Sequence, residues 1–176
     1  MGKINLPVLT AAVAISLALL LLGQHFLFNQ HTLRSWEERF ADIPGVAAAV
    51  VDSTPNGLSL TLKLERETEL RETYPRILDL AAKAGVSFDA ISIQDDRGPV
   101  LSQTIYDIHY AIEEGIATGR FQLMADAVKD ELAARGIDDY ELWVDSEFIY
   151  LEMHYGPEQL YQVFRRGSFQ PRGRAV

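Results

Sequence analysis

The sequence predicts an α+β protein that begins with a transmembrane helix. Three observations lead to this fold class: a long uncharged apolar run opens the chain, apolar and polar residues alternate without exception over 58–65, and apolar residues recur at helical spacing over 101–132. We expect an α/β sandwich of two αββα-type halves, with the order αββαβ in the first half and helices on one face of a sheet.

The apolar run at the N-terminus has the length of a membrane-spanning helix. Residues 6–22 read LPVLTAAVAISLALLLL and residues 26–28 extend the run, without Asp, Glu, Lys or Arg; about 20 apolar residues cross a bilayer. A cleaved signal peptide is the alternative, but no clear small-x-small cleavage site follows, so an uncleaved anchor is favoured. The residues expected within the membrane are Leu6, Val8, Leu9, Ile15, Leu17, Leu19, Leu20, Leu21 and Leu22.

The charges beside the span nearly balance. Lys3 precedes it, and Arg34 and Arg39 follow it. A very short N-terminus ahead of a signal-like helix usually stays inside the cell. We therefore expect a single-pass membrane protein, anchored by residues 1–30, whose soluble domain lies outside the cytoplasm.

The first half of the soluble part covers residues 31–98. It begins with a short helix, because Leu33, Trp36 and Phe40 fall on one helical face. The sequence DIPG ends this helix, since Pro cannot continue it and Gly permits a turn. The Asn-Gly turn makes a hairpin, and an intervening helix makes the next strand parallel to it. The elements that follow the first helix are strands over 46–52 and 58–65, a helix over 68–84 and a strand over 89–94.

The second half covers residues 99–166, and a basic flexible tail occupies 167–176. Two apolar stripes at helical spacing, separated by Gly119, predict a pair of helices. Asp145 opens a tight turn between two strands. The elements that we expect are helices over 101–116 and 121–132, strands over 141–144 and 148–154, and a last short helix that carries Leu160, Val163 and Phe164.

Composition excludes several classes of function. The formal net charge is −9, and an acidic surface repels phosphate backbones, so nucleic acid is not an expected partner. The chain has no cysteine, which excludes disulfides, thiolate catalysis and a lipid attached to cysteine. The arginines of the C-terminal tail favour a solvated end over a binding patch; they are Arg165, Arg166, Arg172 and Arg174.

Motifs of catalysis are missing from the sequence. It contains no phosphate-binding glycine loop, no Gly-x-Ser-x-Gly and no His-Glu-x-x-His. His109 and Glu113 lie four residues apart on one predicted helix, but an exposed pair is favoured over a metal site. Asp95, Asp96 and Asp145 follow or flank strands, where turn-forming carboxylates are common. We expect no enzyme activity, cofactor or metal.

Three aromatic residues are candidates for a protein interface: Trp36, Phe148 and Tyr150. The predicted strand over 148–154 is apolar on both faces, so it is either covered twice or part of an interface. Burial in the core is the favoured interpretation.

The stretch 33–95 resembles the ring-building motif of bacterial membrane ring proteins, which occurs in type III secretion inner rings, the flagellar membrane ring and sporulation channel rings. The resemblance is carried by the order helix–strand–strand–helix–strand, by the sequence Ile43-Pro44-Gly45-Val46 and by the N-terminal span just ahead. It covers about a third of the chain. Unlike the secretion lipoproteins, the chain has no cysteine to carry a lipid. The resemblance implies self-association or assembly with membrane partners.

The function expected from the sequence is therefore structural. The leading hypothesis is a non-enzymatic, membrane-anchored protein whose extracytoplasmic domain mediates protein–protein assembly at the membrane. The alternative is a membrane-tethered sensor or small-ligand-binding module, in which the two halves form a cleft. An enzyme that uses dispersed acids such as Asp95, Asp96 or Asp145 is less favoured.

Overall fold

The computed structural model describes Ser16 and residues 33–55 and 57–167, and it is an α+β fold with two three-stranded sheets. Apart from Ser16, the predicted membrane span lies outside the described residues, with all nine residues assigned to it, as does the tail after Gly167. None of the helices in the described part of the chain combines the length and the apolar character that a bilayer crossing requires.

The first half has the predicted order αββαβ. Residues 33–41 are helical. β1 and β2 form an antiparallel hairpin, and β2 pairs with β3 in parallel, which gives the sheet order β1-β2-β3. The named elements are β1 (Val46–Thr54), β2 (Gly57–Leu64), α2 (Leu70–Lys83) and β3 (Phe88–Gln94).

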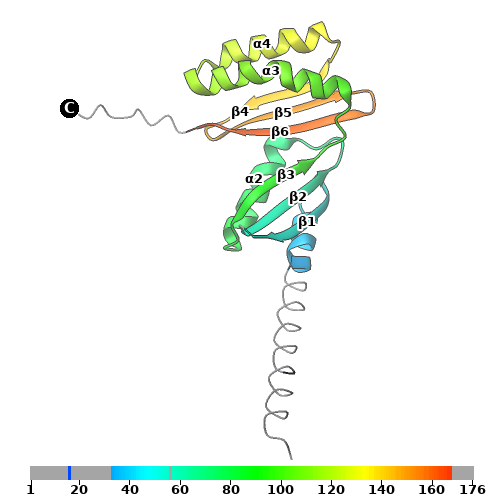
Figure 1. The fold of residues 1–176 in the computed structure, drawn as a ribbon, viewed down its shortest axis with the longest axis vertical. Helices are drawn as coiled ribbons and strands as arrows, with labels where there is room; N and C mark the ends of the chain where they lie inside the picture. Colours follow the sequence, from blue (N-terminus) through cyan, green and yellow to red (C-terminus); the bar gives the residue numbers. More distant parts are fainter. Residues whose placement is uncertain (1–15, 17–32, 56, 168–176) are drawn as a thin grey trace, which may run out of the picture.

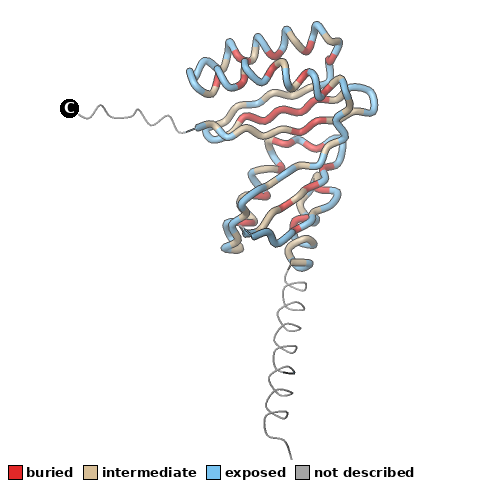
Figure 2. The backbone as a smooth tube through the Cα atoms, in the orientation of Figure 1, coloured by how far each residue is buried: buried red, intermediate tan, exposed pale blue. Residues whose placement is uncertain are grey.

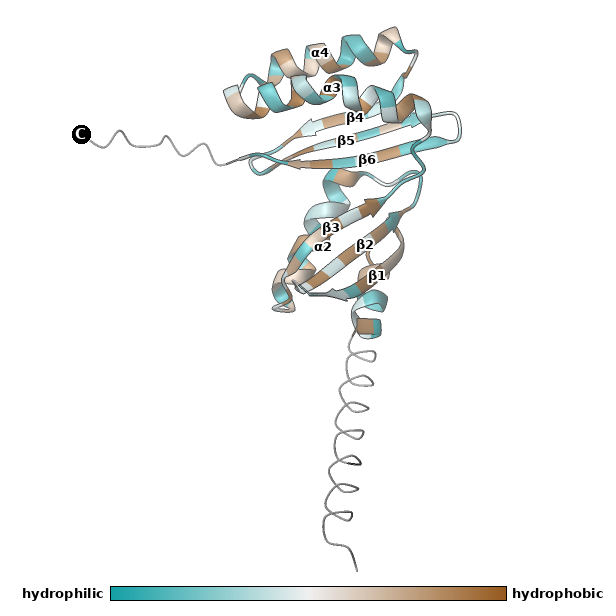
Figure 3. Ribbon diagram, in the orientation of Figure 1, coloured by the Kyte–Doolittle hydropathy of each residue, from teal (hydrophilic) through white to brown (hydrophobic). Residues whose placement is uncertain are grey.

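The alternating sequence of β2 turns one face of the first sheet toward the helices. Leu60, Leu62 and Leu64 are buried and belong to one core cluster with Phe40 of the first helix and Ile77 of α2. Figure 3 shows apolar and polar residues alternating along β2 and β3. The opposite face carries small and polar side chains, because the side-chain period of a strand is two.

The second half has the order ααβββ, which differs from the predicted αββα type. Its helices pack together and cover one face of the sheet β4-β5-β6 (Figure 1). Two antiparallel hairpins build that sheet. The elements are α3 (Pro99–Thr118), α4 (Phe121–Ala134), β4 (Asp139–Val144), β5 (Phe148–Tyr155) and β6 (Glu158–Arg165).

The helix predicted after Pro157 is wrong, since this segment is strand β6. Leu160 and Phe164 pack into the core under α3 and α4, whereas Tyr161 and Val163 pack into the core of the first half. A strand buried on both faces loses its polar alternation, so its apolar residues resemble a helical stripe. The two-residue turn before β6 contains Gly156 at φ +57°, a conformation that favours glycine.

Strand β5 joins the two halves. Ile149, Leu151 and Met153 face α3 and α4, and Tyr150 belongs to the core of the first half. Figure 2 shows buried residues along this middle strand. Figure 1 shows α3 and α4 on one side of the second sheet, and α2 together with the first sheet on its other side. Of the two interpretations of this strand, the one in which it is covered twice is confirmed.

Gly115 sets how closely α3 approaches α4. A Cβ atom at this buried position would lie 2.7 Å from Met124 Sδ and 2.8 Å from Met124 Cβ. Gly115→Val is expected to destabilise the protein by about 1–3 kcal/mol, because overpacking displaces the neighbouring helix. Ala117→Val, on the exposed side of α3, is the matched control and is expected to cost less than about 0.7 kcal/mol. Urea unfolding of both variants checks this, and equal losses would contradict it.

Candidate functional site

The uncovered face of the first sheet is small and polar. The register aligns Val50 of β1 with Thr61 of β2 and Ser92 of β3, and the hydroxyl oxygens of Thr61 and Ser92 are 3.1 Å apart. Val50 is 46% exposed. The helix over 33–41 and α2 pack on the opposite face. This face therefore presents small and polar side chains, with the large apolar side chain of Val50 exposed near its edge.

Strand β1 forms an edge of the first sheet, as its place at the end of the order β1-β2-β3 requires. It is nine residues long and carries no charge before Asp52 and no proline. The Val51 N–H points away from β2 and donates to Glu37 Oε1 at 3.1 Å. Alternate residues direct their N–H groups to the same side, so those of Ala49 and Ser53 also point outward. A long edge strand with few charges is a template for pairing with another strand.

A second feature is the joint where the start of α2 meets the second sheet. Glu152 of β5 is 7% exposed, and its Oε1 accepts a hydrogen bond from the N–H of Leu70, the first residue of α2. The Tyr161 hydroxyl lies 3.2 Å from the carbonyl oxygens of both Glu65 and Arg66. The joint therefore binds the loop before α2 to two strands of the second sheet.

A cleft of about 390 Å³ opens at this joint, between the loop before α2 and strands β4 and β5. Its carboxylates outnumber its basic groups. Arg66 and His154 are the basic side chains in its lining, and Arg66 is engaged, since it donates to the Gly156 carbonyl oxygen at 2.8 Å. The carboxylates are Glu67, Glu69, Asp139, Glu141 and Glu152.

The buried carboxyl group of Glu152 has a perturbed acidity. Burial raises its pKa from the ordinary 4.5 to about 7, opposed by the hydrogen bond from Leu70 and supported by the nearby charges of Glu141 and Glu69. Arg71 pairs with Glu69 at 3.1 Å and with Glu141 at 3.3 Å, and its guanidinium lies over the Trp143 ring. Arg71 therefore partly neutralises the negative charge of Glu69 and Glu141. The raised pKa places the titration of Glu152 close to neutral pH.

His154 lies two residues after Glu152 on β5 and also lines the cleft. Burial lowers the pKa of its imidazole, against the charge of Asp139 on β4, and Arg66 lowers it further. Its Nδ1 is buried and has no hydrogen-bond partner among the residues that the structure describes. The ring packs edge-on against Tyr161, with the centroids 5.8 Å apart. The site thus holds an imidazole whose lowered pKa favours the neutral form, with one nitrogen that is unsatisfied among the described residues.

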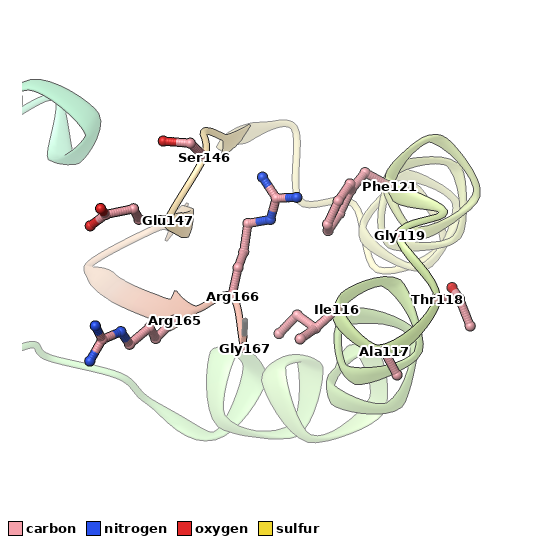
Figure 4. Close-up of a pocket in the computed structure, with 10 residues that line it drawn as sticks. All are labelled: Ile116, Ala117, Thr118, Gly119, Phe121, Ser146, Glu147, Arg165, Arg166 and Gly167. Atoms are coloured by element: carbon pink, nitrogen blue, oxygen red, sulfur yellow. The ribbon is translucent and has the colours of Figure 1, made fainter. Parts of the chain in front are cut away.

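A wider groove of about 960 Å³ lies where the ends of α3, α4 and β6 meet the β4–β5 turn (Figure 4). Arg166 crosses it. Its guanidinium lies 4.3 Å from the centroid of the Phe121 ring and donates to the Asp145 carbonyl oxygen, and its backbone N–H donates to the Glu147 carbonyl oxygen at 2.7 Å. Arg166 therefore fastens the turn to the start of α4, which is a structural role.

The three predicted interface aromatics lie in or beside the core of the first half. Tyr150 is 2% exposed and donates to Asp145 Oδ2 at 2.8 Å. Phe148 and Trp36 are half-buried, Phe148 against Tyr74 and Trp36 against Phe40. Phe148 and Tyr150 therefore contribute to the contact between the two halves of the chain.

The polar residues that the sequence analysis singled out do not converge. Asp145 holds its turn by accepting the N–H groups of Glu147 and Phe148, both at 2.7 Å. Asp95 pairs with Arg97 at 2.6 Å. His109 is exposed on α3, and the described residues contain no group of three or more side chains arranged to hold a metal.

Sequence reasoning did not identify Glu152 and His154 as site residues. One signal was present, since both are polar residues within a strand that is otherwise apolar on both faces. Glu69 and Arg71 join them only through packing between the two halves, which local patterns do not encode, whereas Glu141 pairs with Glu152 across the β4–β5 hairpin.

The raised pKa of Glu152 makes the stability of the fold depend on pH. Between about pH 4.5 and 7 the folded protein keeps a proton that the unfolded chain releases, so the free energy of unfolding falls as pH rises through this window. Glu152→Gln keeps an acceptor for Leu70 but does not titrate. When the pH rises from about 4 to about 8, the free energy of unfolding of wild type is expected to fall by roughly 3 kcal/mol relative to that of this variant. Urea unfolding at several pH values measures the difference, and a constant difference would contradict the raised pKa.

No family model, curated protein or solved structure matches this chain. The case for its function therefore rests on the geometry of its own residues.

Proposed function

We propose that this chain is a non-enzymatic, membrane-anchored protein whose α+β domain assembles with other protein chains at the membrane surface. The observation that carries the proposal is the edge of β1 that no other described strand pairs with. The Val51 N–H on this edge is taken by Glu37, but the outward N–H groups of Ala49 and Ser53, the nine-residue length and the lack of charge before Asp52 are the properties of a strand that accepts another strand.

The position of β1 along the chain supports assembly close to a membrane. The uncharged run at 6–28 has the composition of an anchor. The helix over 33–41 follows it closely, and β1 begins at Val46. Only a short stretch of chain therefore separates the proposed anchor from the edge strand, which keeps that edge near the bilayer.

The order of the first half also supports a structural role. The helix over 33–41, β1, β2, α2 and β3 occur in the order that resembles ring-building motifs, whose implied function is self-association or assembly with membrane partners. Two of the acids considered for catalysis have structural roles instead: Asp95 pairs with Arg97, and Asp145 holds a turn.

Photo-crosslinking tests the edge directly. The chain has no cysteine, so Ser53→Cys on β1 places a single maleimide–benzophenone probe on the exposed edge of the full chain in membranes. We expect a crosslinked product of defined mass. Adding Val50→Lys is expected to lower its yield at least about tenfold, because pairing would desolvate an ammonium group.

The matched control is Leu123→Lys, which makes the same kind of change at a side chain that is 58% exposed on α4. It is expected to leave the yield unchanged. If the probe labels only the monomer, or if Val50→Lys crosslinks as well as wild type, assembly through β1 is wrong.

Membrane topology is a separate part of the proposal. A reporter enzyme that works only outside the cytoplasm is expected to be active when it is fused to the C-terminus. The reason is that a very short N-terminus ahead of the apolar run stays inside, which places the C-terminus outside. Activity of a reporter that works only in the cytoplasm would reverse the proposed orientation.

A further inference from the structure

A carboxylate occupies the middle of the outer edge of β1. Glu37 Oε1 accepts the N–H of Val51 at 3.1 Å, on the side of β1 that faces away from β2. A neighbouring strand in a sheet places a carbonyl oxygen about 2.9 Å from such an N–H group. The two oxygens would need the same position, so no strand can pair with Val51 while Glu37 holds it.

The rest of the edge is divided by this contact. Ala49 and Ser53 also direct their N–H groups outward, and their Cα atoms lie about 13 Å apart, because a strand rises about 3.3 Å per residue. A continuous ladder would use the N–H groups of Ala49, Val51 and Ser53 in turn. With the middle group occupied, an added strand can pair with only one end of β1.

The helix that carries Glu37 is held in place by apolar contacts. Phe40 is fully buried, and its ring meets that of Phe88 on β3 edge-on, with the centroids 5.6 Å apart. Trp36 packs against the same core. Because these contacts fix the helix against the sheet, the hydrogen bond from Val51 to Glu37 is not needed to dock it and is free to control access to the edge.

We propose that Glu37 is an autoinhibitory residue, whose carboxylate competes with an incoming strand for the Val51 N–H at the edge of β1. Release of Glu37 exposes three successive outward N–H groups and lets a partner strand pair along the whole edge. The inference rests on the proposed assembly through β1 and adds its regulation. Charged side chains that shield an edge strand are a common way in which proteins prevent unwanted pairing.

The place of the helix in the chain links this contact to the proposed anchor. The helix over 33–41 lies between the uncharged run at 6–28 and the first sheet. A hydrogen bond is lost when its donor and acceptor are more than about 3.5 Å apart, so a small displacement of the helix is sufficient to release Val51. Events at the membrane can therefore act on the edge through this helix.

Photo-crosslinking from Ser53→Cys on the full chain in membranes tests the competition, at an expression level that keeps the yield far below saturation. Adding Glu37→Ala is expected to raise the yield at least about fivefold, because an incoming strand no longer has to displace a charged acceptor. Glu37→Gln keeps an acceptor oxygen without the charge and is expected to give an intermediate yield. Glu38→Ala, at the exposed neighbouring position on the same helix, is the matched control and is expected to leave the yield unchanged.

Amide hydrogen exchange tests the contact itself, independently of any partner. In the full chain in detergent, diluted until no crosslinked product forms, Glu37→Ala is expected to speed exchange at Val51 at least about fivefold, because its N–H loses its acceptor. Exchange at Val50, whose N–H faces β2 in the hairpin, is the internal control and is expected to stay as in wild type.

The outcomes separate this inference from the proposed assembly. Equal yields from Glu37→Ala and Glu38→Ala, or equal exchange at Val51 with and without Glu37, would overturn the competition and leave assembly through β1 standing. No product from any of the chains would overturn both, since there would be no strand for Glu37 to exclude. Product from the Glu37→Ala chain alone would support the competition and contradict assembly of the unchanged chain. If Glu37→Ala does not fold, Glu37→Gln gives the same comparison.

Discussion

Burial of β5 on both faces holds the two halves of this protein together. Its odd-numbered apolar residues, Ile149, Leu151 and Met153, pack under α3 and α4, and on the opposite face Tyr150 packs against the first half. Apolar burial of this kind is the main favourable term in folding. The second sheet therefore has a core on each side, one shared with α3 and α4 and the other shared with the first half.

The same double burial places a carboxylate where water does not reach it freely. Burying an unpaired charge is costly, and Glu152 is tolerated because α2 begins at this point and offers the Leu70 N–H. The first N–H groups of a helix also favour negative charge. The cleft beside Glu152 is thus a consequence of how the halves pack, and Glu141 adds to its acidity because it pairs with Glu152 across the β4–β5 hairpin.

The edge of β1 and the cleft belong to different parts of this architecture. The edge of β1 is one end of the first sheet, and no strand of the described part of the chain pairs with it there. The cleft belongs to the contact between α2 and the second sheet.

The sequence by itself determined the elements whose signals are local. The alternation of Leu58 to Leu64, the helical stripes on either side of Gly119 and the turn at Asp145 predict β2, α3, α4 and the β4–β5 hairpin. The order αββαβ of the first half follows from the same patterns. Strand β6 was missed because both of its faces are buried, which removes the period of two that distinguishes a strand from a helix.

The cleft, by contrast, could be identified only from the tertiary structure. Glu152 and Leu70 are 82 residues apart in the sequence, and their hydrogen bond exists because β5 packs on the start of α2. Periodicity reports which face of an element is apolar, but it does not report which element covers that face. The pKa of Glu152, the unpaired nitrogen of His154 and the charge around them all depend on which element covers which face. The apolar N-terminal run and the lack of charge before Asp52 in β1 were evident from the residues alone.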